Sequence, residues 1–444
     1  MNGKIAGFCS ILRFRWMYFS SCQRAWRLVC LGTFVISVVE LFRGLMMAGS
    51  GSYGDIAYSL LVAAVSFFSL MKDALSLIPK SETKERLICF KDRADSDCCA
   101  ALAIAVEQIG MAKSELEDGF ERIVFPGRGD FVVVSSQVDG FLRRGGKVWF
   151  TVRRAQNTSM WRRINRRLEE ASRLLSLKQK ADRYVDFFNE DKVMLTSKVV
   201  VTGDQMFLTV AKTCYYASYL SNELYRDSIV DEDGVTWSNG LDGVWSPFDD
   251  EGADFALHEL SGGISAHVGV NTIGVTKDGY VLIWQQGSGQ HSCNQAAPTG
   301  SGSMDWKDLS AARPAQDDSG RLLFNDVIVY AAERELREES FAGSYVNGLS
   351  TRIIGYFRWG RRGGLPGFVC LTKIPLMRDD IEVRNREVCR NVHLEKLRLY
   401  GTRADMIASL DAYLQACDRE LRMSIPLVVG LRCLRNLLKS GEDL

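Results

Sequence analysis

The sequence predicts an α+β protein with a helical hairpin at its N-terminus, a mixed α/β middle region and a C-terminal α/β region organised around one acidic helix. Three observations support this fold class. Two long apolar spans lie near the N-terminus, strand and helix patterns alternate in the middle, and a charged helical stretch follows paired strand patterns near residue 330. A chain of 444 residues is long enough for two or three domains.

The composition is that of an ordinary globular protein, with 46% hydrophobic and 25% charged residues. A formal net charge of +1 gives no overall attraction to nucleic acid, so we expect no specific binding to a nucleic-acid duplex. Twelve cysteines are scattered without a C-x-x-C pair, and only four histidines accompany them. This pattern argues against a zinc site and a disulfide framework, and it favours a reducing cytoplasm for the soluble part.

Two apolar spans, residues 28–48 and 56–78, predict a transmembrane helical hairpin. At about 1.5 Å per residue, each span is long enough to cross a hydrocarbon core of about 30 Å. Basic residues in segment 1–27 and after residue 78 favour a cytoplasmic location for both termini. A cleavable signal peptide is the competing interpretation of the first span, but a second span follows within a few residues and no small-residue cleavage site clearly intervenes.

Two pairs of ionisable residues interrupt the apolar spans: Glu40 with Arg43, and Lys72 with Asp73. A charge in lipid costs about 2.5 to 3.5 kcal/mol, so these side chains are expected to pair, to reach the interface or to face a wet interior. Glu40 either pairs with Arg43 near the far interface or lines the seam of a homo-oligomer and takes part in a pore. Lys72 and Asp73 are the further pore candidates.

Residues 81–259 form a middle region of mixed α/β pattern that carries no assignable motif. Strands are predicted at residues 131–134 and 147–152, and helices at residues 94–113 and 160–188. A tight hairpin is predicted at Gly203-Asp204. A basic stripe at 143–167 either meets lipid headgroups or a polyanionic ligand, or is the solvated face of a helix. A segment rich in Gly and Asp, 231–263, indicates a domain boundary at about residue 259.

The C-terminal region, residues 260–444, begins with a predicted β-hairpin around the turn 277–279. Further strands are predicted at residues 351–359 and 368–374, and a helical tail with an apolar face is predicted at residues 405–438. The loop between the last two strands is rich in glycine and carries Arg361 and Arg362. Because the guanidinium fork matches phosphate oxygens, this loop is either a phosphate-binding element or an exposed hairpin tip.

The most specific chemical pattern lies in residues 320–342, within a helix predicted from 326 to 340. Glu335, Glu338 and Glu339 occupy relative positions 0, 3 and 4, which lie on one face of a helix. Like charges on one face repel, and a divalent cation is the strongest remedy because hard cations such as Mg²⁺ take carboxylate oxygens. A solvated amphipathic helix is the alternative interpretation.

This stretch resembles the Nudix box, in which a glycine, five residues, an acid, seven residues and then R-E-apolar-x-E-E-x-G-apolar hold a metal against a pyrophosphate. The positions that fit this spacing are Gly320, Asp326, Arg334, Glu335, Leu336, Glu338, Glu339 and Ala342. The resemblance implies an α/β/α sandwich with a mixed sheet. It further implies catalytic and metal-ligating roles for the three glutamates with Mg²⁺ or Mn²⁺, and an orienting role for the arginine. Gly320, Arg334, Arg361 and Arg362 are the candidate nucleotide- or phosphate-binding residues.

Two positions depart from that box, and its first glycine is ambiguous. Asp326 stands where the family usually has Glu, and Phe341 stands where it has Gly. A glycine at the end of a helix often serves a positive φ, so a bulky residue there predicts strain. Either Gly320 starts the box, or Gly302 does with an insertion after it.

The order of the three parts resembles the two-span Nudix membrane effectors of bacterial cyclic-oligonucleotide antiphage signalling systems. This resemblance implies a multi-pass protein of the bacterial inner membrane, a cyclic oligonucleotide or related nucleotide as ligand, and a homo-oligomer whose spans disrupt the bilayer. The alternative is a membrane-anchored Mg²⁺-dependent Nudix hydrolase that cleaves nucleoside diphosphate derivatives.

Overall fold

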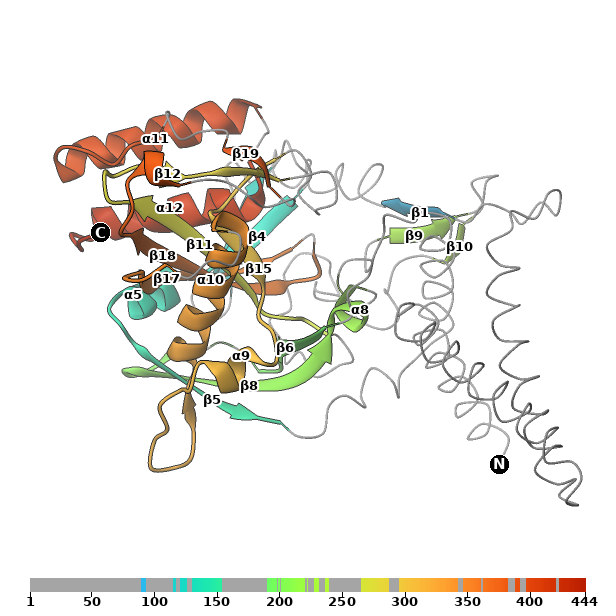
Figure 1. Cartoon of the computed structure of the whole chain (residues 1–444). Helices are drawn as coiled ribbons and strands as arrows, with labels where there is room; N and C mark the ends of the chain where they lie inside the picture. Colours follow the sequence, from blue (N-terminus) through green and yellow to red (C-terminus); the bar gives the residue numbers. More distant parts are fainter. Residues whose placement is uncertain are drawn as a thin grey trace, which may run out of the picture. The chain divides into compact units, whose positions relative to one another are not determined.

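The computed structural model in Figure 1 describes parts of the middle and C-terminal regions. The described residues are 89–92, 115–116, 120–125, 130–153, 190–197, 199, 201–219, 222, 227–230, 236–238, 265–286, 295–341, 346–360, 362–381, 388–391, 397–420 and 423–444. The predicted hairpin at 28–78, with Glu40, Lys72 and Asp73, and the helices predicted at 94–113 and 160–188 lie outside them. None of the helices that these residues form has both the length and the apolar character needed to cross a bilayer.

The chain divides into two compact units. The smaller unit comprises residues 1–90, 164–189 and 229–238, and the larger one comprises residues 91–163, 190–228 and 239–444. A three-stranded sheet has the order β1-β9-β10. Its strands are β1 (Cys89–Asp92), β9 (Asp227–Val230) and β10 (Thr236–Ser238).

An eight-stranded mixed sheet forms the centre of the larger unit. Its order is β12 (Val281–Leu282), β11 (Gly269–Thr276), β18 (Leu365–Ile374), β17 (Ser350–Trp359), β4 (Asp130–Val134), β3 (Phe120–Phe125) and β2 (Glu115–Leu116), with β15 (Gly300–Ser303) also paired to β11. Strands β11 and β18 are parallel, while β17 is antiparallel to both β18 and β4. The predicted α+β class with mixed sheets is therefore confirmed for the described residues.

Two smaller sheets complete the larger unit. The five-stranded one runs β16 (Leu322–Leu323), β5 (Lys147–Val152), β8 (Gln205–Cys214) and β6 (Asp191–Leu195), with β7 (Val201–Thr202) paired to β8. The three-stranded one runs β14 (Ala296–Ala297), β13 (Trp284–Gln286) and β19 (Val388–Asn391). The predicted hairpin at Gly203 is present as β7 and β8, and Gly203 takes the positive φ of 62° that its turn requires.

The central sheet packs helices on both faces. Successive side chains of a strand point to opposite faces of this sheet. Val270 of β11 and Phe368 of β18 lie in one hydrophobic cluster with Phe324 of helix α10 (Phe324–Ser340). Val369, the residue after Phe368 in β18, lies in a second cluster with Leu431 of helix α12 (Ile425–Lys439). The described C-terminal elements therefore form a layer of sheet between α10 and α12. The shorter helices are α5 (Ser136–Arg143), α8 (Tyr215–Ser218), α9 (Asp308–Ala311) and the 3-10 helix η7 (Arg378–Asp380).

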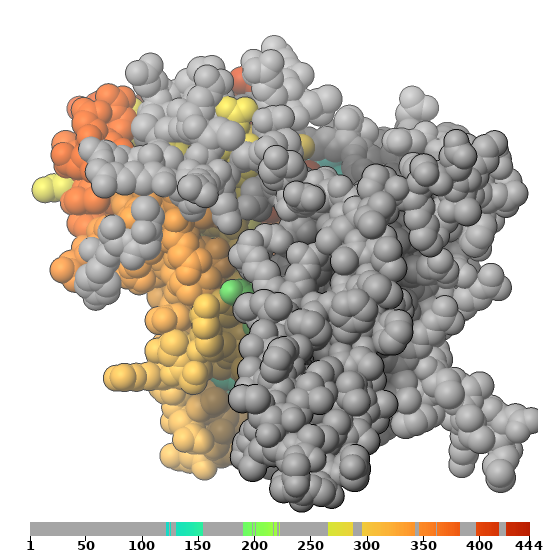
Figure 2. All heavy atoms as spheres, turned by 45° about the vertical axis from the view of Figure 1, so that its right-hand side comes forward, coloured from blue at the N-terminus to red at the C-terminus, as the bar shows by residue number. Residues whose placement is uncertain are grey.

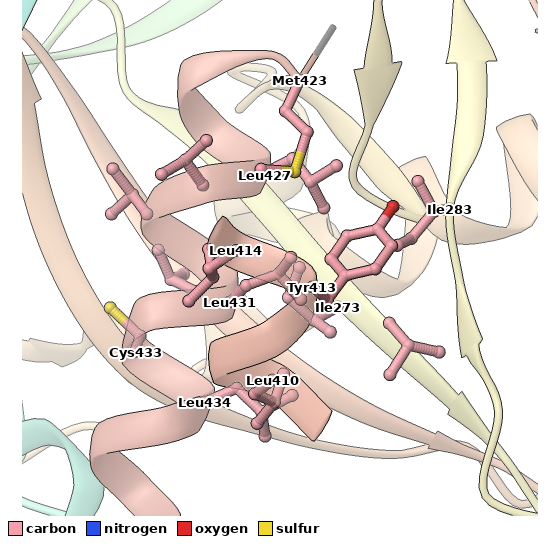
Figure 3. Packing of buried hydrophobic residues seen from close by; sticks show 14 of the residues in the cluster. Ile273, Ile283, Leu410, Tyr413, Leu414, Met423, Leu427, Leu431, Cys433 and Leu434 are labelled. Carbon is pink, nitrogen blue, oxygen red and sulfur yellow. The ribbon is translucent and has the colours of Figure 1, made fainter. Parts of the chain in front are cut away.

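The predicted helical tail at 405–438 consists of two helices, α11 (Arg403–Glu420) and α12. Ser424 caps the second helix by accepting a hydrogen bond from the amide of Leu427, and a proline occupies its first turn. Because of these helix-start signals, the segment that the apolar pattern predicts as one helical tail forms two helices. Figure 3 shows leucines of both helices packed together beside Ile273 of the sheet.

Strands from both sides of the predicted boundary at residue 259 pair within the same sheets. Strand β4 pairs with β17, and β5 pairs with β16. Helix α5 also contributes across this position, since the Asp139 carboxylate accepts a hydrogen bond of 2.9 Å from the amide of Tyr356, beside a bulge in β17. Burial raises the pKa of Asp139 to about 7. The middle region thus supplies part of the framework around α10.

Candidate functional site

Helix α10 carries the acidic residues, and its first turn is fixed to strand β5. The Asn325 side chain accepts a hydrogen bond of 2.8 Å from the Val148 amide and donates one of 3.0 Å to the Gly146 carbonyl. Val327 and Ile328 of the next turn are fully buried against the sheet. The N-terminal half of α10 therefore anchors the helix, and its C-terminal half presents the charged residues.

Arg334 is the centre of an ion-pair cluster. Its guanidinium lies 3.0 Å from Asp308, 3.0 Å from Glu335, 3.2 Å from Glu338 and 3.7 Å from Asp305. Burial opposes the charge on this group, but the three neighbours Glu335, Asp308 and Asp305 raise the pKa of Arg334 above its ordinary value. The predicted orienting role of Arg334 fits this geometry, because one planar fork holds carboxylates from two segments.

Glu335 lies against the backbone of strand β15. A Cβ atom added to Gly302 would stand 2.2 Å from the Glu335 carboxyl carbon, so only glycine leaves room for this carboxylate. A Cβ atom on Gly300 would stand 2.7 Å from the backbone nitrogen of Leu336, so strand and helix approach closely there too. Burial raises the pKa of Glu335 to about 7, although the charge of Arg334 acts in the opposite direction.

The other two acids have different surroundings. The Glu338 side chain is 51% exposed and pairs with Arg334, whereas Glu339 is buried and accepts a hydrogen bond of 3.2 Å from the Ser301 amide. The three predicted site acids therefore share one end of α10, where Glu335 and Glu338 pair with Arg334 and Glu339 contacts strand β15.

The acids at this end of α10 form no closed metal site. Within the described ranges, no three Asp, Glu, His or Cys side chains converge as a group that could hold a metal ion. Mg²⁺ is usually bound by one or two carboxylates and completes its shell with waters and phosphate oxygens. Glu335 and Glu338, which both contact the same Arg334 nitrogen, are the two carboxylates that would hold such a cation.

Several residues of the cluster carry no sequence signal of their own. Lys192 of β6 lies 2.5 Å from Asp305 and 3.2 Å from Glu190, and Lys307 lies 3.1 Å from the other oxygen of Asp305. Burial alone would raise the pKa of Asp305, but the hydrogen bond and charge of Lys192 hold it below the ordinary value. The charged run at 305–308, between the glycine-rich strand and the acidic helix, is the signal that pattern reasoning could have used.

The two candidate glycines of the motif have different surroundings. Gly302 lies against Glu335, whereas Gly320 lies in a turn with φ of 80° where its amide donates a hydrogen bond to the Asp317 carbonyl. Asp326, the acid at the matching position of the motif, accepts a hydrogen bond of 2.9 Å from the Ala315 amide. Gly302 is therefore the candidate that lies beside a predicted site acid, and Gly320 forms a turn.

The left-handed backbone expected at Phe341 is absent. This residue ends α10 with φ of −124° and ψ of 17°, and its side chain is buried in a cluster with Leu336 and Trp284. The strain predicted from a positive φ at this position was wrong, because Phe341 itself is not left-handed. Phe341 instead fastens the acidic end of the helix to the core.

The predicted arginine loop is described only in part. Arg361 lies outside the described residues, and Arg362 places its guanidinium 5.0 Å from the ring centre of Trp359. Burial lowers the pKa of Arg362, and the charges that act on it include those of Tyr215 and Asp130. Arg362 therefore belongs to a neighbourhood built by β4, α8 and the end of β17.

Comparison with known proteins adds no assignment to this geometry. A scan against protein-family models finds none that matches the chain, and no curated protein matches it in sequence. The candidate function therefore rests on the chemistry of α10 and its neighbours.

Proposed function

We propose that the C-terminal region recognises the phosphates of a nucleotide second messenger at α10 and that this recognition controls the predicted N-terminal spans. In this proposal the protein is a membrane effector of bacterial antiphage defence, and its ligand is a cyclic oligonucleotide or a related nucleotide. The observation that carries the proposal is the Arg334 cluster, where one half-buried guanidinium pairs with two candidate cation ligands, Glu335 and Glu338.

A bound Mg²⁺ or Mn²⁺ would neutralise phosphate oxygens at this position. The surrounding residues hold the candidate cation-binding carboxylates in place. Arg334 keeps Glu335 and Glu338 together, Gly302 leaves space for the first carboxylate, and Glu339 is tied to the β15 backbone. These contacts place the acids before a ligand arrives, which reduces the entropy cost of binding it.

Binding of the nucleotide without hydrolysis is favoured because the acids of the cluster already form ion pairs. Arg334 pairs with Glu335 and Glu338, and Lys192 pairs with Asp305, so part of the carboxylate charge is already neutralised. Hydrolysis is the second candidate, and one observation supports it. Burial brings the pKa of Glu335 to about 7, a value suited to a general base near neutral pH.

The membrane part of the proposal rests on the sequence. The spans at 28–48 and 56–78 supply the hairpin, and Glu40, Lys72 and Asp73 are its candidate polar contacts in a homo-oligomer. A two-span anchor is an unusual attachment for a housekeeping hydrolase, and this supports the effector role.

Two measurements on the full chain in detergent test the site. Binding of a Mg²⁺-nucleotide diphosphate is followed by calorimetry, and product formation is followed by chromatography. We expect Mg²⁺-dependent binding without product, and weaker binding after Glu338→Gln. Glu333→Gln is the matched control, because Glu333 pairs with Arg337 on the same helix at 2.9 Å. Product formation that is lost in Glu335→Gln would instead establish the hydrolase.

Depolarisation of cells that carry the messenger synthase tests the effector role. Leu31→Arg and Leu61→Arg place a charge in each predicted span, and we expect both to abolish depolarisation while purified protein still binds nucleotide. Depolarisation that persists in both variants contradicts the role of the spans.

A further inference from the structure

We infer that the surface around Tyr400 is a two-fold interface on which a second copy of this chain docks. The surface is called here the tyrosine–arginine patch, and its residues are Tyr280, Met377, Arg378, Asp380, Arg398 and Tyr400. They belong to the turn between β11 and β12, to η7 with the residue before it, and to residues 398–400. The patch shares no residue with the Arg334 cluster, so the interface does not depend on the proposed ligand site.

Tyrosine rings and guanidinium groups stack at the centre of the patch. The guanidinium carbon of Arg398 lies 5.0 Å from the ring centre of Tyr280 and 4.8 Å from that of Tyr400. A second guanidinium, that of Arg378, lies 4.7 Å from the ring centre of Tyr280. Cation–π contacts of this kind restrict the four side chains before a partner arrives, so less rotamer freedom is lost on binding.

The backbone of the patch is joined to the core. The Val281 amide donates a hydrogen bond of 3.0 Å to the Leu397 carbonyl, and the Leu399 amide donates one of 2.7 Å to the Gly279 carbonyl. Both leucines are buried in the hydrophobic cluster that also contains the apolar face of α12. A Cβ atom on Gly279 would stand 2.7 Å from the Leu399 carbonyl oxygen, so the hairpin and residues 397–400 lie in close contact. The patch is therefore formed before any partner binds.

Two apolar side chains of the patch are exposed to solvent. Tyr400 is 71% exposed and Met377 is 44% exposed, the two largest values among the large hydrophobic residues of the described part of the chain. Figure 2 shows yellow spheres of the β11–β12 region beside orange spheres of the C-terminal part at the molecular surface. Tyrosine, methionine and arginine are enriched in protein–protein interfaces, so these residue types favour a protein as the partner.

The charges of the patch are balanced. In the three segments that form it, 277–280, 377–380 and 398–400, the charged residues are the cations Lys277, Arg378 and Arg398 and the acids Asp278, Asp379 and Asp380. Within one copy, Arg378 pairs with Asp379 at 2.9 Å. A surface without net charge gives no attraction to a polyanion such as a nucleic acid, but it can match a copy of itself, because its cations are accompanied by as many acids.

Arg398 and Asp380 supply the pairing between copies. The Arg398 Nε donates a hydrogen bond of 3.1 Å to the Asp278 carbonyl, and among the described residues no acid pairs with its guanidinium. Asp380 accepts a hydrogen bond of 3.3 Å from the Met377 amide, and within the same ranges no cation pairs with it. A two-fold axis through the patch brings Arg398 of each copy to Asp380 of the other and covers the exposed apolar side chains of both.

Photo-crosslinking of the purified full chain in detergent tests this contact. Benzoylphenylalanine replaces Tyr400, and isotope-labelled and unlabelled copies are mixed so that mass spectrometry separates cross-links between copies from those within one copy. We expect cross-links between copies that join position 400 to peptides containing residues 277–280, 377–380 or 398–400. Tyr330, an exposed tyrosine on α10, is the matched control position and is expected to give no cross-link to the patch. Attachment of position 400 to nucleic acid or to another surface, or no cross-link between copies, would overturn the inference.

Charge reversal tests the pairing in the same cross-linking assay. Arg398→Glu and Asp380→Arg are each expected to lower the yield of cross-links between copies about tenfold or more, because like charges then face each other. A mixture of the two variants is expected to restore the yield, since each reversed charge meets its opposite. Arg435→Glu, which breaks the 2.8 Å pair with Asp411 outside the patch, is the matched control and is expected to leave the yield unchanged. Single variants that cross-link like the wild type, or a mixture whose yield stays low, refute the two-fold pairing.

Discussion

Replacing Glu335 by glutamine is expected to stabilise the protein at alkaline pH. Burial raises the pKa of Glu335 from 4.5 to about 7, so the folded protein holds this proton more tightly than the unfolded chain does. The stabilisation by this group is therefore complete below pH 4.5, declines as the pH rises from 4.5 to 7, and is lost above that range. Glutamine resembles the protonated acid and removes this decline.

The size of the effect follows from the same rise in pKa. At about 1.4 kcal/mol for each unit of pKa, the rise from 4.5 to about 7 means that ionising Glu335 in the folded protein costs at most about 3.5 kcal/mol. Relaxation of the side chain toward solvent lowers that ceiling. For a unit of this size, Glu335→Gln is expected to raise Tm by roughly 3 to 10 °C at pH 8. At pH 5 the two proteins are expected to unfold at nearly the same temperature.

Tryptophan fluorescence of the full chain, heated in a metal chelator at a series of pH values from 5 to 8, measures this difference. Asp139 is also a buried acid with a pKa of about 7, but it is present in both proteins and cancels in the comparison. Glu333→Gln again serves as the control on the same helix. A Tm difference that does not change with pH, or a less stable Glu335→Gln at pH 8, would refute the reasoning.

Four further substitutions test the packing of α10. Gly302→Ala is expected to leave Tm within a few degrees but to abolish Mg²⁺-dependent binding in calorimetry, because the flexible Glu335 carboxylate must move away. Gly300→Ala is expected to lower Tm clearly, because its added methyl group meets the backbone of α10. Phe341→Ala is expected to lower the free energy of unfolding by about 3 kcal/mol in urea, because Phe341 is buried. A gain in stability would instead indicate that Phe341 is strained. Asn325→Ala removes two hydrogen bonds to β5 and is expected to cost about 1 to 3 kcal/mol in the same assay.

The local elements of the larger unit could be predicted from sequence because their patterns are local. The strands now seen as β17 and β18 show continuous apolar or alternating residues, and the helix that bears Glu335 shows both periodicity and an acidic face. Both strands and the helix lie where they were predicted, within a few residues. The acids follow from the helix, since positions three and four apart share a face.

The role of Lys192 could not be predicted, because nothing local marks this residue. Lys192 lies in an ordinary buried strand, and it acquires a partner through pairing with a segment 113 residues later in the chain. The glycine of the site was ambiguous for a related reason. Gly320 fits the spacing of the motif directly and Gly302 only with an insertion. The contact of Gly302 with Glu335 depends on how β15 packs against α10.

The hydrogen bonds between Asn325 and strand β5 have a consequence for the synthesis of this protein. They join residues 177 and 179 positions apart, and Val148 is translated long before its partner. Pairing over such separations makes folding slow, and strands that wait for partners are prone to aggregation. Strand β5 must therefore wait for α10 before the first turn of that helix can be anchored.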